Sequence, residues 1–313
     1  MLEKLIGKLA QVLLVITIGL GIFFTIGSKR IEHAPQPVKY RYEEVRSPFD
    51  NKIYALKIPE KMDFAGETVP LSEADVQERL DREMLINAYW HSQTLYIMKQ
   101  YSKQIKFIEP ILERNGIPHD FVYLCIAESG LQYNALSGSG AMGLWQFMKP
   151  TAQKYGLLIN EEVDERMNYE KATDAACKYF KEGKERFGSW TMAAASFNMG
   201  IDGLDKVSRM QATNNYFDLY LNKETSRYVY RILALKEILS NPTKYGFFLE
   251  SEDFYESINY KTVTVDSSIH NLTEFAKTQG TSYKMLRVMN PWMIGYSLTN
   301  SSRRTFEFKI PVQ

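Results

Sequence analysis

The chain has 313 residues, 45% of them hydrophobic and 24% charged, which is enough for a sizeable core in one large domain or two smaller ones. The 38 Lys and Arg residues nearly balance the 37 Asp and Glu residues. The resulting net charge of +1 argues against a protein that binds nucleic acid through many phosphate contacts. Cys125 and Cys177 are too few for a disulfide framework. Each lies in an apolar helical pattern, which favours small buried side chains and leaves one disulfide between packed helices open.

Residues 1–30 are dominated by an uncharged apolar stretch at 9–27, which as a helix would span about 28 Å, close to the thickness of a bilayer core. No small-x-small cleavage site precedes Lys29, and no cysteine follows that could carry a lipid, so we predict an uncleaved membrane anchor. Basic residues are more numerous after the stretch than before it. Taken alone, this count would place the rest of the chain in the cytoplasm, although long domains can be translocated despite such charges.

Residues 28–50 contain three prolines among mixed charges, and the segment 31–70 is predicted to be a spacer. Residues 71–245 show helical periodicity interrupted by glycine-rich turns, without the alternation typical of strands. Alternation appears at 260–265 and again at 305–311, and two short helical patterns lie between them at 272–280 and 283–290. We therefore predict a mainly α protein, with an all-helical domain at 71–245 followed by a small βααβ domain at 255–313.

Glu128 is a carboxylate in an otherwise apolar pattern. Phe121, Leu124, Cys125 and Glu128 are spaced at i, i+3, i+4 and i+7, which places them on one stripe of a helix that ends before Gly130. Burial and the negative end of the helix dipole would both raise the pKa of this carboxyl, as a general acid at neutral pH requires. From spacing alone, a solvated Glu at a helix end is the simpler interpretation.

The run at 137–148 contains a G-x-G-x-x-G pattern, but a helix precedes it and no βαβ unit surrounds it, which excludes a dinucleotide site. A tight turn that lets the backbone approach a ligand or another helix is the better interpretation. The charged cluster Asp164, Glu165 and Arg166 is interpreted as a local ion pair. The four histidines are dispersed and show no metal-binding spacing, so we expect no metal and no cofactor.

Four motifs occur in order, namely Ala-Glu-Ser-Gly at 127–130, Gly-Ala-Met-Gly-Leu-Trp-Gln-Phe-Met at 140–148, Ser-Phe-Asn-Met-Gly at 196–200 and Glu-Thr-Ser-Arg-Tyr-Val at 224–229. Together they resemble glycoside hydrolase family 23, the goose-lysozyme-like lytic transglycosylases with an SLT domain, and more specifically its membrane-bound members. The resemblance covers about 105–239. It implies a lysozyme-like helical fold and cleavage of the β-1,4 bond between N-acetylmuramic acid and N-acetylglucosamine in peptidoglycan, leaving 1,6-anhydro ends.

In this family a single Glu is both general acid and general base, and by motif position that residue is Glu128. The resemblance also implies substrate-binding roles for Ser137, Gln146, Met148, Phe197, Asn198, Glu224 and Tyr228. Ser137 and Gln146 would bond the substrate near Glu128, Met148 would line the site, Asn198 and Tyr228 would hold the sugar, and Glu224 would order the site. Of the aromatic residues, Trp145, Phe197 and Tyr228 are expected to line the cleft. Phe197 stands where the family has Tyr, and the missing hydroxyl could weaken stabilisation of the developing charge.

The segment 255–313 resembles a diverged LysM module, which binds N-acetylglucosamine chains. Its usual Gly-Asp-Thr-Leu opening is replaced by Asp-Ser-Ser-Ile-His at 266–270, so a structural or orienting role is favoured slightly over glycan binding. The expected partners are peptidoglycan strands and, through the N-terminal helix, a bacterial inner membrane, with the helical domain in the periplasm. A hydrolytic muramidase and a catalytically weakened peptidoglycan-binding scaffold remain as alternatives.

Overall fold

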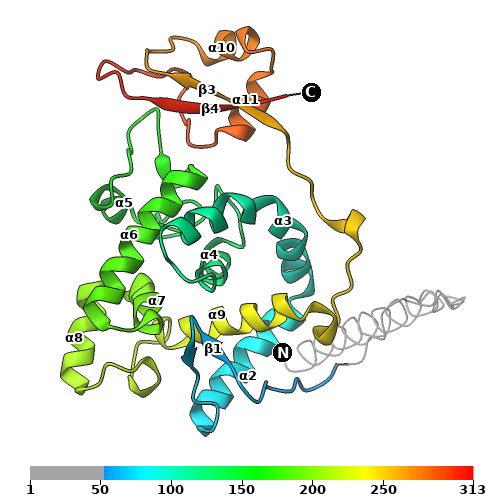
Figure 1. Cartoon of the computed structure of the whole chain (residues 1–313), viewed down its shortest axis with the longest axis vertical. Helices are drawn as coiled ribbons and strands as arrows, with labels where there is room; N and C mark the ends of the chain where they lie inside the picture. Colours follow the sequence, from blue (N-terminus) through cyan, green and yellow to red (C-terminus); the bar gives the residue numbers. More distant parts are fainter. Residues whose placement is uncertain (1–52, 313) are drawn as a thin grey trace, which may run out of the picture. The chain divides into compact units, whose positions relative to one another are not determined.

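The computed structural model describes residues 53–312, which are mainly helical (Figure 1), and this confirms the predicted fold class. The elements of the larger, helical part are α2 (Ala74–Tyr89), α3 (His91–Arg114), α4 (Phe121–Ser129), α5 (Lys149–Lys154), η1 (Glu165–Met167), α6 (Tyr169–Phe187), α7 (Trp190–Met199), α8 (Ile201–Gln211), η2 (Tyr216–Asp218), α9 (Thr225–Ser240), η3 (Pro242–Tyr245) and η4 (Ser251–Asp253). The predicted anchor at 1–30 lies outside the described residues. Within residues 53–312, no helix is both long enough and apolar enough to cross a membrane.

The C-terminal part is the predicted βααβ unit, formed by β3 (Tyr260–Val265), α10 (Leu272–Thr278), α11 (Tyr283–Met289) and β4 (Phe306–Pro311). Its two strands pair antiparallel, with Tyr260 opposite Pro311 and Val265 opposite Phe306. Alternate residues of β4, namely Phe306, Phe308 and Ile310, are buried in a core that is separate from the main helical core. This alternation is the period of two that the sequence shows.

Helix α4 occupies the middle of the helical part, where it packs against α3 and α9 (Figure 1). All six residues from Phe121 to Ile126 are buried, so the helix is apolar around its whole circumference. The single apolar stripe expected from the spacing was therefore too narrow. A helix covered on every side is held in place by packing alone, which gives the residues at its end a fixed position.

The end of the predicted spacer belongs to the helical core, which corrects the proposed boundary at residue 70. Strands β1 (Asp63–Phe64) and β2 (Glu67–Thr68) form a short hairpin. The Phe64 ring is fully buried, and its centroid lies 5.3 Å from that of Phe121. The Glu67 carboxylate accepts hydrogen bonds from the backbone N–H groups of Trp190 and Thr191 at the start of α7. Three prolines upstream suggested a spacer, but these contacts make residues 63–68 part of the fold.

The C-terminal unit takes part of its core from the helical part of the chain. Val163, in the loop before η1, is fully buried in the same apolar cluster as Trp292 and Met293. It forms an isolated antiparallel β-bridge with Met293. The backbone N–H of the next residue, Asp164, donates to the Trp292 carbonyl at 2.8 Å.

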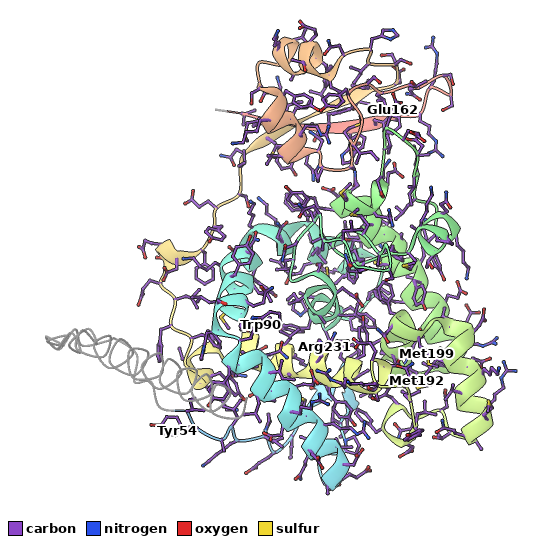
Figure 2. The ribbon with its side chains drawn as sticks, turned by 180° about the vertical axis from the view of Figure 1, so that it is seen from behind. Tyr54, Trp90, Glu162, Met192, Met199 and Arg231 are labelled. Carbon is purple, nitrogen blue, oxygen red and sulfur yellow. The ribbon has the colours of Figure 1, made fainter. Side chains whose placement is uncertain are left out.

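Glu162, beside this bridge, binds the C-terminal unit with both its backbone and its side chain (Figure 2). Its carbonyl accepts from the N–H groups of Ile294 and Gly295, and its carboxylate accepts from the Ser297 hydroxyl at 2.6 Å and the Thr299 N–H at 2.7 Å. The Ser297 bond is the largest cause that lowers the pKa of Glu162 below its ordinary value. The C-terminal unit is thus docked on residues 162–164 by packing and hydrogen bonds together.

Replacing Val163 with Ala is expected to loosen the C-terminal unit, although residue 163 lies about a hundred residues before it. Truncating a fully buried Val should cost about 1–3 kcal/mol in the free energy of unfolding. Urea denaturation and the rate of proteolysis within 255–313 measure the effect. Val207→Ala, on α8 and outside the C-terminal core, is the matched control and should leave that rate unchanged. Equal proteolysis of the two variants would contradict the shared core.

Cys125 and Cys177 are both free and fully buried. Burial raises the pKa of the Cys125 thiol well above its ordinary value and that of Cys177 to about 12. Both side chains therefore fill small spaces in the core, as the apolar pattern predicted, and they are not bridged to each other.

Candidate active site

The structure places Glu128 in the last turn of α4, one of the few positions of this helix that are not fully buried. Gly130 ends the helix in the left-handed region at φ +58°. Apolar packing fixes the helix, and the abrupt end leaves the carboxyl of Glu128 half-buried at its margin. A carboxyl in this position is desolvated and yet retains some exposure to solvent.

Tyr228, on α9, is brought into direct contact with Glu128. The Tyr228 hydroxyl donates a hydrogen bond to Glu128 Oε1, and the tyrosine side chain is only 1% exposed. Burial raises the pKa of Glu128 from its ordinary value to about 7, while the Tyr228 bond and the positive charge of Arg231 oppose this rise. The predicted direction of the pKa shift is therefore present, and burial is its main cause.

Arg231 joins Glu224 to the surroundings of Glu128. It projects from α9 one turn beyond Tyr228 (Figure 2), and its Nη2 lies 3.0 Å from Glu224 Oε1. Its Nε lies 3.9 Å from Oε2 of Glu83, a residue of α2 that is 1% exposed and also pairs with Arg227 at 2.6 Å. Among the described residues no hydrogen bond joins Glu224 to Glu128, and Glu224 acts on that carboxyl through space, where its charge raises the pKa.

The sequence interpretation missed Arg231 and Glu83. Arg231 is three residues after Tyr228 and seven after Glu224, so helical spacing alone could have placed Tyr228 and Arg231 on one face of α9, with Glu224 at its N-cap. Glu83 has no such signal, because its carboxylate reaches the site from a helix far away in the sequence. Only the packing of α2 against α9 brings it there.

The loop that carries Ser137, Gln146 and Met148 is held mainly by its own hydrogen bonds. Gln146 adopts φ +46°, unusual for a residue other than glycine, and its Nε2 donates to the carbonyls of Ala135 and Gly143, each at 2.8 Å. The Ser137 hydroxyl accepts from the Ala141 N–H at 2.9 Å and also bonds the Ser139 hydroxyl. Met148 is 42% exposed at the start of α5. Among the described residues, no hydrogen bond joins this loop directly to Glu128.

The buried side chain of Arg166 also holds this loop in place. Its guanidinium pairs with Asp164 at 2.7 Å and donates to the carbonyls of Gly140 and Phe147, at 2.9 and 3.1 Å. The predicted local ion pair is confirmed, and it is buried. Gly143 has φ +85°, and a Cβ there would lie 2.0 Å from the Arg166 carbonyl oxygen. The glycine-rich turn therefore serves the close approach of two backbone segments, one of the two possibilities the pattern offered.

Phe197 and Asn198 lie on α7 with different surroundings. The Phe197 ring packs against Phe147, Tyr179 and Phe180, with centroids 5.0–5.4 Å apart. Asn198 Oδ1 accepts from the Thr225 hydroxyl at 2.8 Å, which ties α7 to the start of α9. Phe197 thus joins the aromatic core to the loop at 137–148, and Asn198 lies next in space to the segment that carries Glu224.

Trp145 does not line a cleft, contrary to expectation. It is fully buried, and its Nε1 donates to the Thr173 hydroxyl on α6 at 3.0 Å. A large aromatic residue in a motif is as easily a core residue as a sugar-stacking one, and here its indole N–H finds a partner inside the core. Within residues 53–312, no group of three or more His, Cys, Asp or Glu side chains could hold a metal ion.

Replacing Tyr228 with Phe is expected to raise the pKa of Glu128 above 7. The hydroxyl bond favours the ionised carboxylate, so its loss should shift the pKa upward by about 1–2 units. The pH dependence of kcat/KM for the peptidoglycan cleavage that the family resemblance implies would report this as an alkaline limb moved to higher pH. Tyr230→Phe, two residues along the same helix, should leave the limb in place. An unmoved limb in Tyr228→Phe would contradict the assignment of the limb to Glu128.

Comparison with known families accounts for both parts of the chain. Residues 107–219 match the Transglycosylase SLT domain, and residues 261–313 match the Soluble lytic transglycosylase C-terminal LysM-like domain. The chain carries an SLT domain and a LysM-like domain. Glu128, the loop at 137–148 and α7 all lie within the SLT match, whereas Glu224 and Tyr228 lie just beyond its end.

Two curated relatives are equally similar to this chain. They are the membrane-bound lytic murein transglycosylases D of Escherichia coli K12 and of Escherichia coli O6:H1, each 27% identical over 228 residues. The alignment covers 71% of this chain and 49% of each relative, so the chain matches about half the length of these proteins.

Proposed function

We propose that this protein is a peptidoglycan lytic transglycosylase that cleaves the N-acetylmuramic acid–β-1,4–N-acetylglucosamine bond, with Glu128 as its single general acid and base. The observation that carries the proposal is the half-buried Glu128 carboxyl, whose pKa is raised to about 7 and whose Oε1 is held by Tyr228. A group with a pKa near the working pH can both give and take a proton. The SLT match and the two murein transglycosylase relatives support the same activity.

The first step is protonation of the glycosidic oxygen by Glu128. The bond between C1 of the muramic acid and this oxygen then breaks, and the bonding electrons leave with the oxygen. In the second step the ionised Glu128 takes the proton of the muramic C6 hydroxyl while the C6 oxygen bonds to C1. A 1,6-anhydro end forms, water is not consumed, and Glu128 regains its proton. The Tyr228 bond stabilises the ionised carboxylate between the two steps.

The remaining site residues are proposed to bind the glycan, and their hydrogen bonds suggest which atoms are available for it. Gln146 uses its Nε2 within the loop, which leaves its Oε1 to accept from a sugar hydroxyl. Asn198 uses its Oδ1, which leaves its amide N–H groups to donate to an acetamido carbonyl. Met148 and Ser137 would contact the sugar from the same loop as Gln146.

Glu224 is proposed to order the site through Arg231 and not to attack the sugar. Phe197 is proposed to hold the loop by packing, since its ring contacts Phe147. If the missing tyrosine hydroxyl limits the activity, Phe197→Tyr should increase it. This variant also tests the alternative of a weakened, peptidoglycan-binding scaffold.

Digestion of purified sacculi with the wild-type protein tests the proposal. Muropeptides with 1,6-anhydro ends are the expected product. Reducing-end muramic acid in their place would establish a hydrolytic muramidase. No release above that of Glu128→Gln would establish a scaffold.

The proposed location is the bacterial inner membrane, with the predicted anchor at 1–30 and the SLT domain in the periplasm. The apolar stretch at 9–27 and the membrane-bound relatives support this placement. A reporter fused after Gln313 that is active only in the periplasm tests it, because a reporter active only in the cytoplasm would reverse the orientation.

A further inference from the structure

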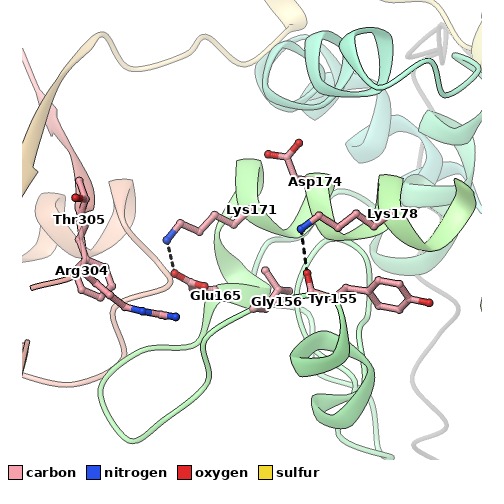
Figure 3. A pocket seen from close by; sticks show the side chains of 10 residues that line it. Tyr155, Gly156, Glu165, Lys171, Asp174, Lys178, Arg304 and Thr305 are labelled. Atoms are coloured by element: carbon pink, nitrogen blue, oxygen red, sulfur yellow. Dashed lines mark hydrogen bonds and ion pairs between the residues drawn. The ribbon is translucent and has the colours of Figure 1, made fainter. Parts of the chain in front are cut away.

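A cavity of about 380 Å³ lies between the SLT domain and the LysM-like domain (Figure 3). One wall is α6 with the loop at 155–157, and the other is formed by residues 304–306 at the start of β4. The volume falls within the range of small-molecule sites, about 300–1,000 Å³. None of the residues proposed to cleave or bind the glycan lines this cavity, so it is distinct from the candidate active site.

The two acidic residues of the cavity wall are already paired. Glu165 binds Lys171 and accepts from the Leu158 N–H at 2.7 Å. Asp174 is paired with Arg114 at 2.8 Å and accepts from Asn115. Neither carboxylate is therefore available to neutralise further cations in the cavity.

Two cations of the cavity wall lack such a partner. Within residues 53–312 Arg304 makes no ion pair, and the hydrogen bond of the Lys178 ammonium goes to the Tyr155 carbonyl, at 3.4 Å. The two side chains extend toward the cavity from opposite walls, Arg304 from the LysM-like domain and Lys178 from α6 (Figure 3). The cavity therefore has an excess of positive charge, and its guanidinium is suited to bidentate binding of a carboxylate.

The cavity also has apolar side chains in its walls and a fixed shape. Phe306 and Leu157 line it from opposite walls, and both are largely buried. The contacts of Glu162 and Val163 hold the two walls together, so the site does not have to be assembled when a ligand arrives. Small apolar side chains next to a free carboxylate would match this combination.

We propose that this cavity binds the free carboxylate end of a short peptide, of the kind that peptidoglycan carries on its muramic acid residues. Identifying this peptide as part of peptidoglycan depends on the proposed function. Arg304 would hold the carboxylate, Lys178 would add a second positive charge, and the small side chains of the peptide would lie beside the part of Phe306 that lines the cavity. The enzyme would thereby distinguish glycan that bears peptides from bare glycan at a site away from the reacting bond.

Calorimetric titration of the full chain carrying Glu128→Gln, which removes turnover, tests the proposal with N-acetyl-D-alanyl-D-alanine as the probe. We expect the acid to bind at least about tenfold more tightly than its C-terminal amide, and Arg304→Gln to remove this difference. Arg303→Gln, at the neighbouring position that does not line the cavity, is the matched control and should retain the difference. Equal binding of acid and amide, or equal loss in the two Arg variants, would overturn the proposal.

Two further measurements separate the possible outcomes. Inorganic phosphate that competes as well as the acid peptide would establish a general anion site and overturn the proposed peptide specificity. Digestion of sacculi and of peptide-free glycan by the wild type and Arg304→Gln should show a preference for peptide-bearing glycan only in the wild type. Failure of the proposed function appears as no cleavage of either substrate, whereas failure of the peptide site appears in the titration, which requires no cleavage.

Discussion

Replacing Glu128 with Gln is expected to reduce the release of soluble muropeptides from sacculi by about a thousandfold or more, because in the proposed function this one group performs both proton transfers. Gln has nearly the same shape and can still accept the hydrogen bond from Tyr228, so the fold should be retained. Chromatographic quantification of anhydro-muropeptides measures the loss. Cleavage by the variant at a rate near that of the wild type would rule out Glu128 as the acid.

The same substitution is expected to stabilise the protein at alkaline pH. The pKa of Glu128 is raised from 4.5 to about 7 in the folded state, so folding favours the protonated carboxyl. Stability is therefore lost as the pH rises from about 4.5 through about 7, by up to about 3 kcal/mol. Gln does not ionise and avoids this loss.

Urea denaturation at pH 8 and pH 4 separates this effect from a general change in packing. Glu128→Gln should be more stable than the wild type at pH 8 and nearly equal to it at pH 4. If Glu128→Gln were no more stable than the wild type at pH 8, the ionised carboxylate of Glu128 would not destabilise the folded state. In the proposed function, the raised pKa of this carboxyl is what lets it provide a proton near neutral pH.

Replacing Arg166 with Met is expected to lower the free energy of unfolding by about 3–5 kcal/mol, the largest loss we predict for a residue outside the reacting centre. Asp164 is 4% exposed and would be left as an unpaired buried charge. The carbonyls of Gly140 and Phe147 would lose their donor as well. Because these carbonyls belong to the loop that carries Ser137 and Gln146, cleavage of peptidoglycan should fall together with stability.

Arg114→Met is the matched control for this prediction. Arg114 also pairs with an aspartate, Asp174, but its side chain is 58% exposed, and its loss should cost no more than about 1 kcal/mol. If the two variants lost comparable free energy of unfolding, burial would not be the reason that the Arg166–Asp164 pair stabilises the protein.

Much of the fold follows from local patterns. The helical periodicity at 71–245 and the alternation at 260–265 and 305–311 predict the elements that the structure contains, because each pattern has the period of the element that it forms. Glu128 could be proposed as the candidate general acid because of the motif around it together with its position in an apolar segment. Its raised pKa follows from the same apolar surroundings.

The features that were missed depend on contacts between residues far apart in the sequence. Glu83 reaches the site from α2, and the hairpin at 63–68 is fixed by Phe121 and α7. Trp145 was assigned to a cleft because motifs do not distinguish a buried ring from an exposed one. No local pattern contains these contacts, since each depends on which helices pack together.

The docking of residues 162–164 means that the two family matches do not mark a physical boundary. Val163 lies inside the SLT match, yet its side chain completes the core of the LysM-like domain. Asp164 also pairs with Arg166, which in turn holds the loop at 137–148. In evolutionary terms, a foreign module that lacked partners for these residues would leave Val163 exposed and Glu162 without its hydrogen-bond donors. A change on either side of this contact should be accepted only together with a compensating change on the other.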